Sequence, residues 1–163
     1  MNWSNIFDYV DGALFWKIHA NNNAPKGSLA GTIRNDNYVG VYYLGKYYFA
    51  HKIIYEMFNG PLPEGLIVDH KDRNTLNNLK ENLRAVTYSQ NSMNKRGNKI
   101  ATSDYKGVSW HKQKGKWVSA IKINGSHKHL GFFHEEYLAA LAYDTAAKAN
   151  HGEYASLNFP SLT

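Results

Sequence analysis

The sequence contains no cysteine among its 163 residues. Disulfide bonds are therefore excluded, and nothing in the composition indicates a secreted protein. Zinc ions that hold small folds together are usually bound by cysteine thiolates. We therefore expect no structural zinc ion in this protein.

Long apolar runs are missing as well, so we expect no membrane-spanning segment and no membrane partner. The first residues, MNWSNIFDYVDG, hold two acids and no basic residue, and they do not resemble a signal peptide. We therefore expect a cytoplasmic protein. Hydrophobic residues make up 43% of the chain, which is enough for a packed core in one ordinary domain or two small ones.

Acidic residues are scarce in one part of the chain. Residues 93–128 hold nine of the 19 lysines and arginines and only one acid, Asp104, whereas the net charge of the whole chain is +6. A solvated charged surface rarely separates its charges so sharply. The distribution favours contact with a nucleic acid, whose phosphates attract clustered cations.

Residues 1–95 predict a β-rich region followed by a strand–loop–strand–helix unit. Short aromatic strands fill residues 1–50, with a turn at Gly45-Lys46, and AHKIIYEMFN has the apolar spacing of a helix that ends before Gly60-Pro61. GLIVDH and LRAV predict two strands on either side of the polar loop KDRNTLNNLKEN. A Thr-x-x-Gln capping box at residues 87–90 then predicts the start of a second helix.

Residues 105–163 predict a three-stranded antiparallel sheet packed on one helix. The strands are YKGVSWH, KWVSAIKIN and HKHLGFF, with turns at Lys114-Gly115 and Asn124-Gly125. EEYLAALAYDTAAKAN has an alanine-rich face that can approach a sheet closely. The polar segment SMNKRGNKIATSD before the first strand is expected to be a basic linker, and the whole chain belongs to the α+β class.

The residues best suited to catalysis or metal binding are Asp69 and His70, Asn82 at the end of the polar loop, and Asn91 one turn into the second helix. Hydrolysis of a phosphodiester needs oxygen ligands for a hard cation and a base that is neutral near pH 7. Each residue also has an ordinary structural explanation, because an Asp-His pair is common and asparagines form turns. Composition alone does not select Asn82, since the loop also contains Asn74, Asn77 and Asn78.

The segment GLIVDHKDRNTLNNLKENLRAVTYSQNSMN resembles the ββα-metal motif of HNH homing endonucleases encoded by phages and phage introns. The Asp-His pair, Asn-Asn, Glu-Asn-Leu and a helical Asn occur in the same order, and AHKIIYEMFNGPLPEG before them is also similar. The resemblance implies a DNA endonuclease of a bacterium or a phage-infected cell. The resemblance also implies that Asp69 and Asn91 bind one Mg²⁺ or Mn²⁺ ion, that His70 is the general base, and that Asn82 is the structural member of the catalytic set. His51 is expected to pack or to make a structural hydrogen bond rather than to take part in the chemistry.

The last 60 residues resemble the Apetala or ethylene-response-factor type of DNA-binding domain, through Tyr-Lys-Gly-Val, Gly-Lys-Trp, Leu-Gly, Ala-Tyr-Asp and Leu-Asn-Phe-Pro. The resemblance implies a sheet that lies in the major groove of double-stranded DNA. The side chains that would contact DNA are Lys106, Ser109, His111, Lys112, Lys114, Lys116, Lys122, His127 and His129. Lys106, Ser109 and His127 replace arginines of the plant pattern, so its target sequence does not carry over.

The predicted division is a β-rich region with the HNH module over residues 1–95, a linker over 96–104, and a DNA-binding domain over 105–163. We expect a monomer that nicks DNA, because one module has one active site. The alternative is a DNA-binding regulator with an inactive nuclease module. An RNA-binding module is a weaker alternative, since a sheet fitted to the B-form major groove does not fit the narrow groove of A-form RNA.

Overall fold

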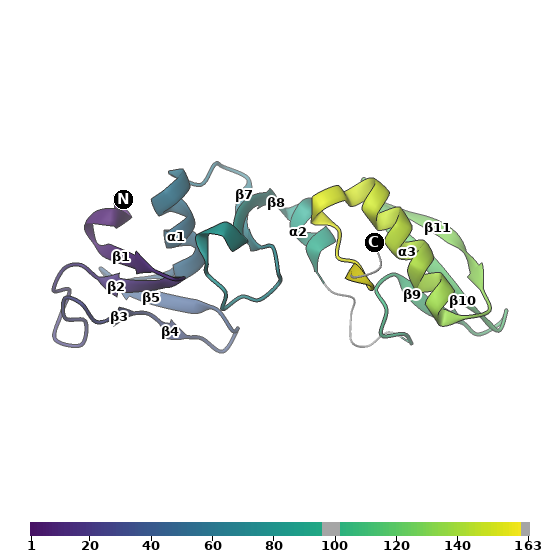
Figure 1. The fold of residues 1–163 in the computed structure, drawn as a ribbon, viewed down its shortest axis with the longest axis horizontal. Helices are drawn as coiled ribbons and strands as arrows, with labels where there is room; N and C mark the ends of the chain where they lie inside the picture. The colour runs from purple at the N-terminus through teal and green to yellow at the C-terminus, as the bar shows by residue number, and fades with distance from the viewer. Residues whose placement is uncertain (96–101, 161–163) are drawn as a thin grey trace. The chain divides into compact units, whose positions relative to one another are not determined.

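The structure of the protein, a computed structural model, describes residues 1–95 and 102–160. It divides into two compact units, Met1–Ser89 and Gln90–Thr163, and both combine antiparallel strands with helices (Figure 1). This mixed architecture confirms the α+β class predicted from the sequence. Within the described ranges, no helix is long and apolar enough to cross a membrane.

The first unit begins with two small sheets. The first sheet has the order β1-β2-β3 and the second the order β4-β5-β6. Their elements are η1 (Trp3–Asn5), β1 (Phe7–Val10), β2 (Ala13–Trp16), β3 (Leu29–Ala30), β4 (Thr32–Ile33), β5 (Val39–Tyr43) and β6 (Lys46–Phe49). The β5–β6 turn lies at Leu44 and Gly45, which both have positive φ angles, of 47° and 78°. The predicted turn was therefore one residue too late.

Helix α1 (Ala50–Asn59) has the predicted bounds and packs against both sheets. Its buried residues Ala50, Ile53 and Ile54 join a core that contains Phe7, Leu14, Trp16 and Val41. The helix ends at Gly60, whose N–H donates to the carbonyl oxygen of Glu56. The core therefore fixes α1 directly ahead of the strand that carries Asp69 and His70.

Strands β7 (Leu66–His70) and β8 (Leu83–Thr87) form an antiparallel hairpin, and the short helix η2 (Lys80–Asn82) closes the loop between them. The register places Asp69 opposite Arg84 and His70 opposite Leu83. Helix α2 (Tyr88–Asn94) follows β8 without a break. The strand–loop–strand–helix order predicted from the sequence is therefore present.

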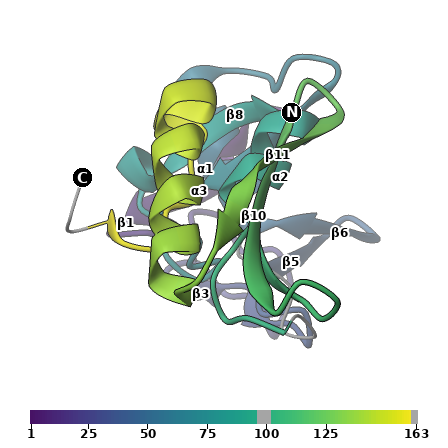
Figure 2. The same ribbon diagram turned by 90° about the vertical axis from the view of Figure 1, so that its right-hand side faces the viewer.

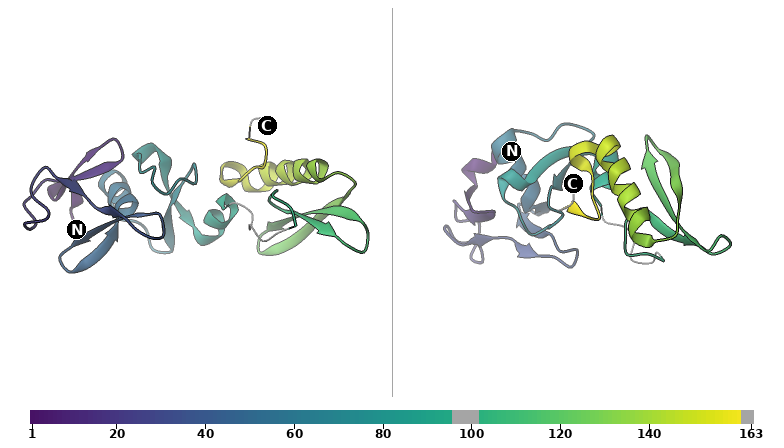
Figure 3. Two further views of the ribbon diagram at one scale, coloured as in Figure 1. Left: turned by 90° about the horizontal axis from the view of Figure 1, so that it is seen from below. Right: turned by 45° about the vertical axis from the view of Figure 1, so that its right-hand side comes forward.

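The second unit is one sheet of three antiparallel strands covered on one face by a long helix (Figures 2 and 3). Its elements are β9 (Val108–His111), β10 (Lys116–Ile123), β11 (Ser126–Phe133), α3 (Glu136–His151) and η3 (Gly152–Tyr154). Ala139, Ala140 and Ala147 are fully buried against the sheet. Their small side chains allow the close approach of helix and sheet that the sequence predicted.

A glycine secures this packing at the start of the sheet. Gly107 has a φ angle of 77°, and a Cβ atom added there would lie 2.0 Å from a ring carbon of Tyr143. The polar segment that was interpreted as a linker starts at residue 92, and its residues 92–94 belong to α2. Of the linker predicted over residues 96–104, residues 96–101 lie outside the described part of the chain. The boundary between the two compact units falls inside α2, at Ser89 and Gln90.

Candidate functional site

Asp69 is held by an arginine from the neighbouring strand. Both Nε and Nη2 of Arg84 lie 3.1 Å from Oδ2 of Asp69, and the two side chains are only 12% and 8% exposed. The pair follows from the register, because the two residues face each other across the hairpin. The carboxylate is thereby fixed and its charge balanced at the end of β7. Arg84 was not singled out from the sequence.

His70 is buried and is held by an asparagine of the loop. Its Nε2 atom lies 2.9 Å from Oδ1 of Asn78, and both residues are less than 5% exposed. An amide oxygen only accepts hydrogen bonds, so Nε2 of the neutral ring donates and the lone pair of the ring lies on Nδ1. The loop thus fixes both the orientation and the tautomer of the imidazole. Sequence reasoning had named Asn78 only as one of several loop asparagines.

Asn82 braces the loop from its end. Its Oδ1 accepts a hydrogen bond from the Asp72 N–H at 3.1 Å, and its Nδ2 donates to Oδ1 of Asp72 at 2.9 Å and to the Asn77 carbonyl at 2.7 Å. Burial acts to raise the pKa of Asp72, but hydrogen bonds from Asn77, Asn74 and Asn82 lower it below its usual value. These hydrogen bonds hold the end of the loop to Asp72 and Asn77. The carboxamide that contacts the imidazole, however, is Asn78.

A second histidine packs behind the first. The His51 ring lies 5.0 Å from the His70 ring at an angle of 66° and 5.3 Å from the Phe49 ring at 27°. Burial, followed by the charges of His70 and Lys52, lowers the pKa of His51 to about 4. Its Nδ1 atom has no hydrogen-bond partner among the residues that the structure describes. His51 is thus a neutral, aromatic wall of the site at pH 7, as the packing interpretation requires.

Asn91 is the fourth residue of α2 and is half-buried. It falls in the second compact unit, whereas Asp69 and His70 fall in the first. The carboxylate of Asp69 and the carboxamide of Asn91 offer oxygen atoms, and the chain has no thiol. This donor chemistry suits a hard divalent cation. Within residues 1–95 and 102–160, no three His, Asp or Glu side chains gather into a group that could hold a metal ion.

The second unit presents a polar face opposite α3. Cross-strand partners share a face of a sheet, and the register pairs Lys116 with His111, Lys122 with His127, Val118 with Ser109, and Ala120 with His129. The alternate residues Trp117 and Ile121 pack toward α3. Six of the predicted DNA-binding residues therefore lie on one face: Ser109, His111, Lys116, Lys122, His127 and His129.

Phe132 lies among these residues and was missed from the sequence. Its ring is 37% exposed, and the rings of His111 and His129 lie 5.5 Å and 4.7 Å from it. The Lys114 ammonium lies 3.9 Å from the centroid of the Phe132 ring. Lys112 is also exposed in the β9–β10 turn. A cationic and aromatic surface therefore covers the outer side of the sheet.

Lys106 differs from the other predicted lysines. Its ammonium donates to the carbonyl oxygens of Met93 and Lys95, and its N–H donates to Oδ1 of Asn158 at 2.7 Å. Asp144, only 1% exposed, accepts hydrogen bonds from the N–H groups of Asn158 and Phe159. Lys106 thus ties residues 93–95 and Asn158 to the start of the sheet, and Asp144 ties residues 158–159 to α3.

Comparison with known proteins finds similarity to two different groups of proteins in different parts of the chain. A family model described as "HNH endonuclease" matches residues 48–93. Protein 3.8 of Escherichia phage T7 is 34% identical over 106 residues, which are 64% of this chain and 86% of that protein. A protein named as an HNH endonuclease in Acanthamoeba polyphaga mimivirus is 36% identical over 118 residues, 72% of this chain and 60% of that protein.

The C-terminal region is similar to plant proteins instead. Dehydration-responsive element-binding protein 2C of Arabidopsis thaliana is 48% identical over 62 residues, which are 37% of this chain and 18% of that protein. A solved structure described as DNA binding and cleavage by the HNH homing endonuclease I-HmuI covers 76% of this chain and 70% of that one. It has a TM-score of 0.43 and a sequence identity of 27%.

Proposed function

The chain belongs to the HNH endonuclease family, and we propose that it cuts double-stranded DNA with the help of one divalent cation, Mg²⁺ or Mn²⁺. The observation that carries the proposal is the Asp69-His70 pair at the end of β7, with Arg84 fixing the carboxylate and Asn78 fixing the imidazole. The matched family segment contains all four of these residues. The chain spans 60% of the length of the mimivirus relative. The proposed activity is therefore that of this chain and does not extend to the whole of the longer protein.

His70 is the proposed general base. Asn78 holds the imidazole through its Nε2 atom, and the imidazole of a neutral histidine can take a proton from a water molecule. The resulting hydroxide can then attack the phosphorus of the scissile phosphodiester, and the bond between phosphorus and the leaving 3′ oxygen breaks. His51 packs against the His70 ring and carries no charge of its own at pH 7. Asn82 keeps the loop, and with it Asn78, in position.

Asp69 and Asn91 are the proposed ligands of the cation. Their oxygens fit Mg²⁺ or Mn²⁺, which prefer hard ligands. Such an ion, when bound, neutralises charge that develops on the phosphate and the leaving oxygen. Arg84 holds Oδ2 of Asp69, so the carboxylate keeps one orientation before the ion arrives.

The second unit is proposed to hold the DNA, over residues 105–163. The outer face of β9-β10-β11 carries Lys116, Lys122 and three histidines, which suits the major groove, while Lys112 and Lys114 in the turn suit phosphates. Lys106 can contact DNA only if its ammonium group leaves the carbonyl oxygens of Met93 and Lys95. As one module has one active site, we propose a monomer that cuts one strand per encounter.

The test is a nicking assay on supercoiled plasmid with Mg²⁺ or Mn²⁺. His70→Ala should lower the cleavage rate by a factor of about 100 or more, with DNA affinity nearly unchanged. The matched control is His19→Ala, an exposed histidine of the same unit. A His70→Ala protein that keeps most of the rate, or full activity in excess chelator, would contradict the proposal. Wild-type protein that binds DNA and never cuts it would favour the regulator alternative.

A further inference from the structure

The sheet β4-β5-β6 has an outer face that the nuclease proposal does not use. The register pairs Tyr42 with Tyr47 and Gly40 with Phe49, so these residues share one face. Tyr42, Tyr47 and Phe49 are 54%, 69% and 37% exposed. The opposite face of the same strands enters the core through Val41 and its neighbours. Three aromatic rings in a row therefore meet solvent, an arrangement that core packing does not explain.

An arginine lies across this row. The guanidinium of Arg34 lies 5.8 Å from the centroid of the Tyr47 ring and 5.2 Å from that of Phe49. The side chain passes over Gly40, where an added Cβ atom would lie 2.6 Å from Cδ of Arg34. Asp36 holds the guanidinium from one side at 3.4 Å. We name Arg34, Tyr42, Tyr47 and Phe49 the aromatic platform.

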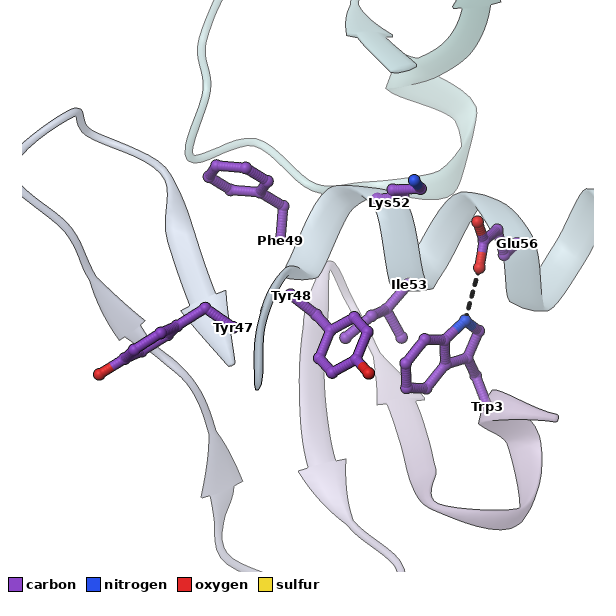
Figure 4. Close-up of a pocket in the computed structure, with 7 residues that line it drawn as sticks. All are labelled: Trp3, Tyr47, Tyr48, Phe49, Lys52, Ile53 and Glu56. Atoms are coloured by element: carbon purple, nitrogen blue, oxygen red, sulfur yellow. Dashed lines mark hydrogen bonds between the residues drawn. The ribbon is translucent and has the colours of Figure 1, made fainter. Parts of the chain in front are cut away.

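A depression of about 240 Å³ adjoins the platform, with Tyr47, Phe49, Lys52 and Trp3 among its lining residues (Figure 4). Glu56, also in its lining, accepts a hydrogen bond from Nε1 of Trp3 at 2.6 Å, so this carboxylate is occupied by a neighbour. Lys52 is exposed on α1. The surroundings therefore combine flat apolar rings with two cations, Arg34 and Lys52, which complement an anionic ligand with flat rings.

The platform is continuous with the catalytic histidine. Phe49 stacks on His51 at 5.3 Å, and His51 contacts His70 at 5.0 Å. All of these residues belong to the first unit. A nucleotide stacked on the platform would therefore lie close to the scissile phosphodiester.

We propose that the aromatic platform, with Lys52, binds unpaired nucleotides of the DNA substrate beside the bond that is cut. Unpaired bases expose their flat faces, which stack on aromatic rings and on arginine, whereas a regular duplex hides those faces within its own stack. The phosphates of the same strand suit Arg34 and Lys52. The enzyme therefore prefers DNA that is locally opened next to the cut. This inference rests on the proposed nuclease function.

The experiment uses the full chain in excess chelator, so that DNA binds without being cut. Fluorescence anisotropy compares a perfect duplex with the same duplex carrying a short central bubble, and 2-aminopurine in the bubble reports stacking. Wild-type protein should bind the bubble about tenfold more tightly and quench the 2-aminopurine. Tyr47→Ala should remove both effects, while Tyr137→Ala, an exposed tyrosine on α3, should change neither.

Gly40→Ala gives a second, milder test. It keeps every aromatic ring but pushes the Arg34 side chain aside, so the preference for the bubble should fall severalfold. Equal affinity of wild-type protein for bubble and duplex, or an unchanged preference in Tyr47→Ala, would overturn the inference. Plasmid nicking measured in parallel with Mg²⁺ separates the two failures. Cleavage without a bubble preference refutes the platform alone, and a bubble preference without cleavage refutes the nuclease alone.

Discussion

Replacing Arg84 with methionine tests whether the Asp69 carboxylate is poised for a cation. Methionine keeps much of the apolar stem of arginine and removes the charge. The two side chains are 12% and 8% exposed, so Asp69 would remain buried without its partner. Removing one member of a buried ion pair typically costs about 3–5 kcal/mol of unfolding free energy. We expect a loss of this size when a chelator is present.

The same substitution should strengthen the binding of a cation. Without Arg84, Asp69 loses the cation that lies 3.1 Å from its carboxylate, and a divalent ion can supply positive charge in its place. An ion at a concentration of about 100 times its dissociation constant stabilises the folded state by about 2.7 kcal/mol. Saturating Mg²⁺ should therefore restore a large part of the stability that Arg84→Met loses, and the variant should gain more from Mg²⁺ than the wild type does.

Urea unfolding followed by tryptophan fluorescence, with Mg²⁺ and with chelator, measures both effects. Lys17→Met is the matched control, because the ion pair of Lys17 with Asp8 is 49% and 57% exposed. An exposed pair contributes about 0–1 kcal/mol, so this variant should unfold nearly as the wild type does. If Arg84→Met loses less than the control in chelator, or gains nothing more than the wild type from Mg²⁺, the assignment of Asp69 as a poised ligand is refuted.

Three further substitutions test the packing inside each of the two units. Burial lowers the pKa of His51 from 6.5 to about 4, so the unfolded chain binds more protons between these values. Stability present above pH 6.5 is then lost as the pH falls toward 4, and His51→Phe should remove up to about 3 kcal/mol of this pH dependence in urea titrations. Gly107→Ala places a Cβ atom against Tyr143 at a positive φ angle and should cost roughly 3 kcal/mol, seen as a lower melting temperature by circular dichroism. Asp144→Asn loses an acceptor for the N–H groups near Asn158 and should cost about 2 kcal/mol, with faster proteolysis of residues 155–160.

Much of the fold was predictable because local patterns determine it. The bounds of α1 follow from apolar spacing and from Gly60, and the predicted helix and the observed one both cover Ala50–Asn59. The β5–β6 turn was placed one residue too late because leucine rarely takes a positive φ angle. Leu44 takes one all the same, since a tight hairpin turn needs two such residues. Tertiary pairing of β5 with β6 therefore overrode a local preference.

The candidate site was predictable only in part. Asp69 and His70 are neighbours in the sequence, so their pairing needed no knowledge of the fold. Arg84 reaches Asp69 through the register of a hairpin with a long loop, which a single sequence does not specify. The same holds for Asn78, because the choice among several loop asparagines depends on the path of the loop in space.

Each compact unit closes its own hydrophobic core, and the described core clusters have no residue in common. Evolution can therefore exchange one module for another by recombination, without rebuilding the remainder. The exchange point, however, lies within α2 rather than in a loop. A hybrid gene must therefore keep α2 intact, because the proposed ligand Asn91 lies within this helix and would otherwise be lost with the exchanged module. On the proposed division of labour, the DNA-binding module can therefore be exchanged without rebuilding the core of the nuclease module.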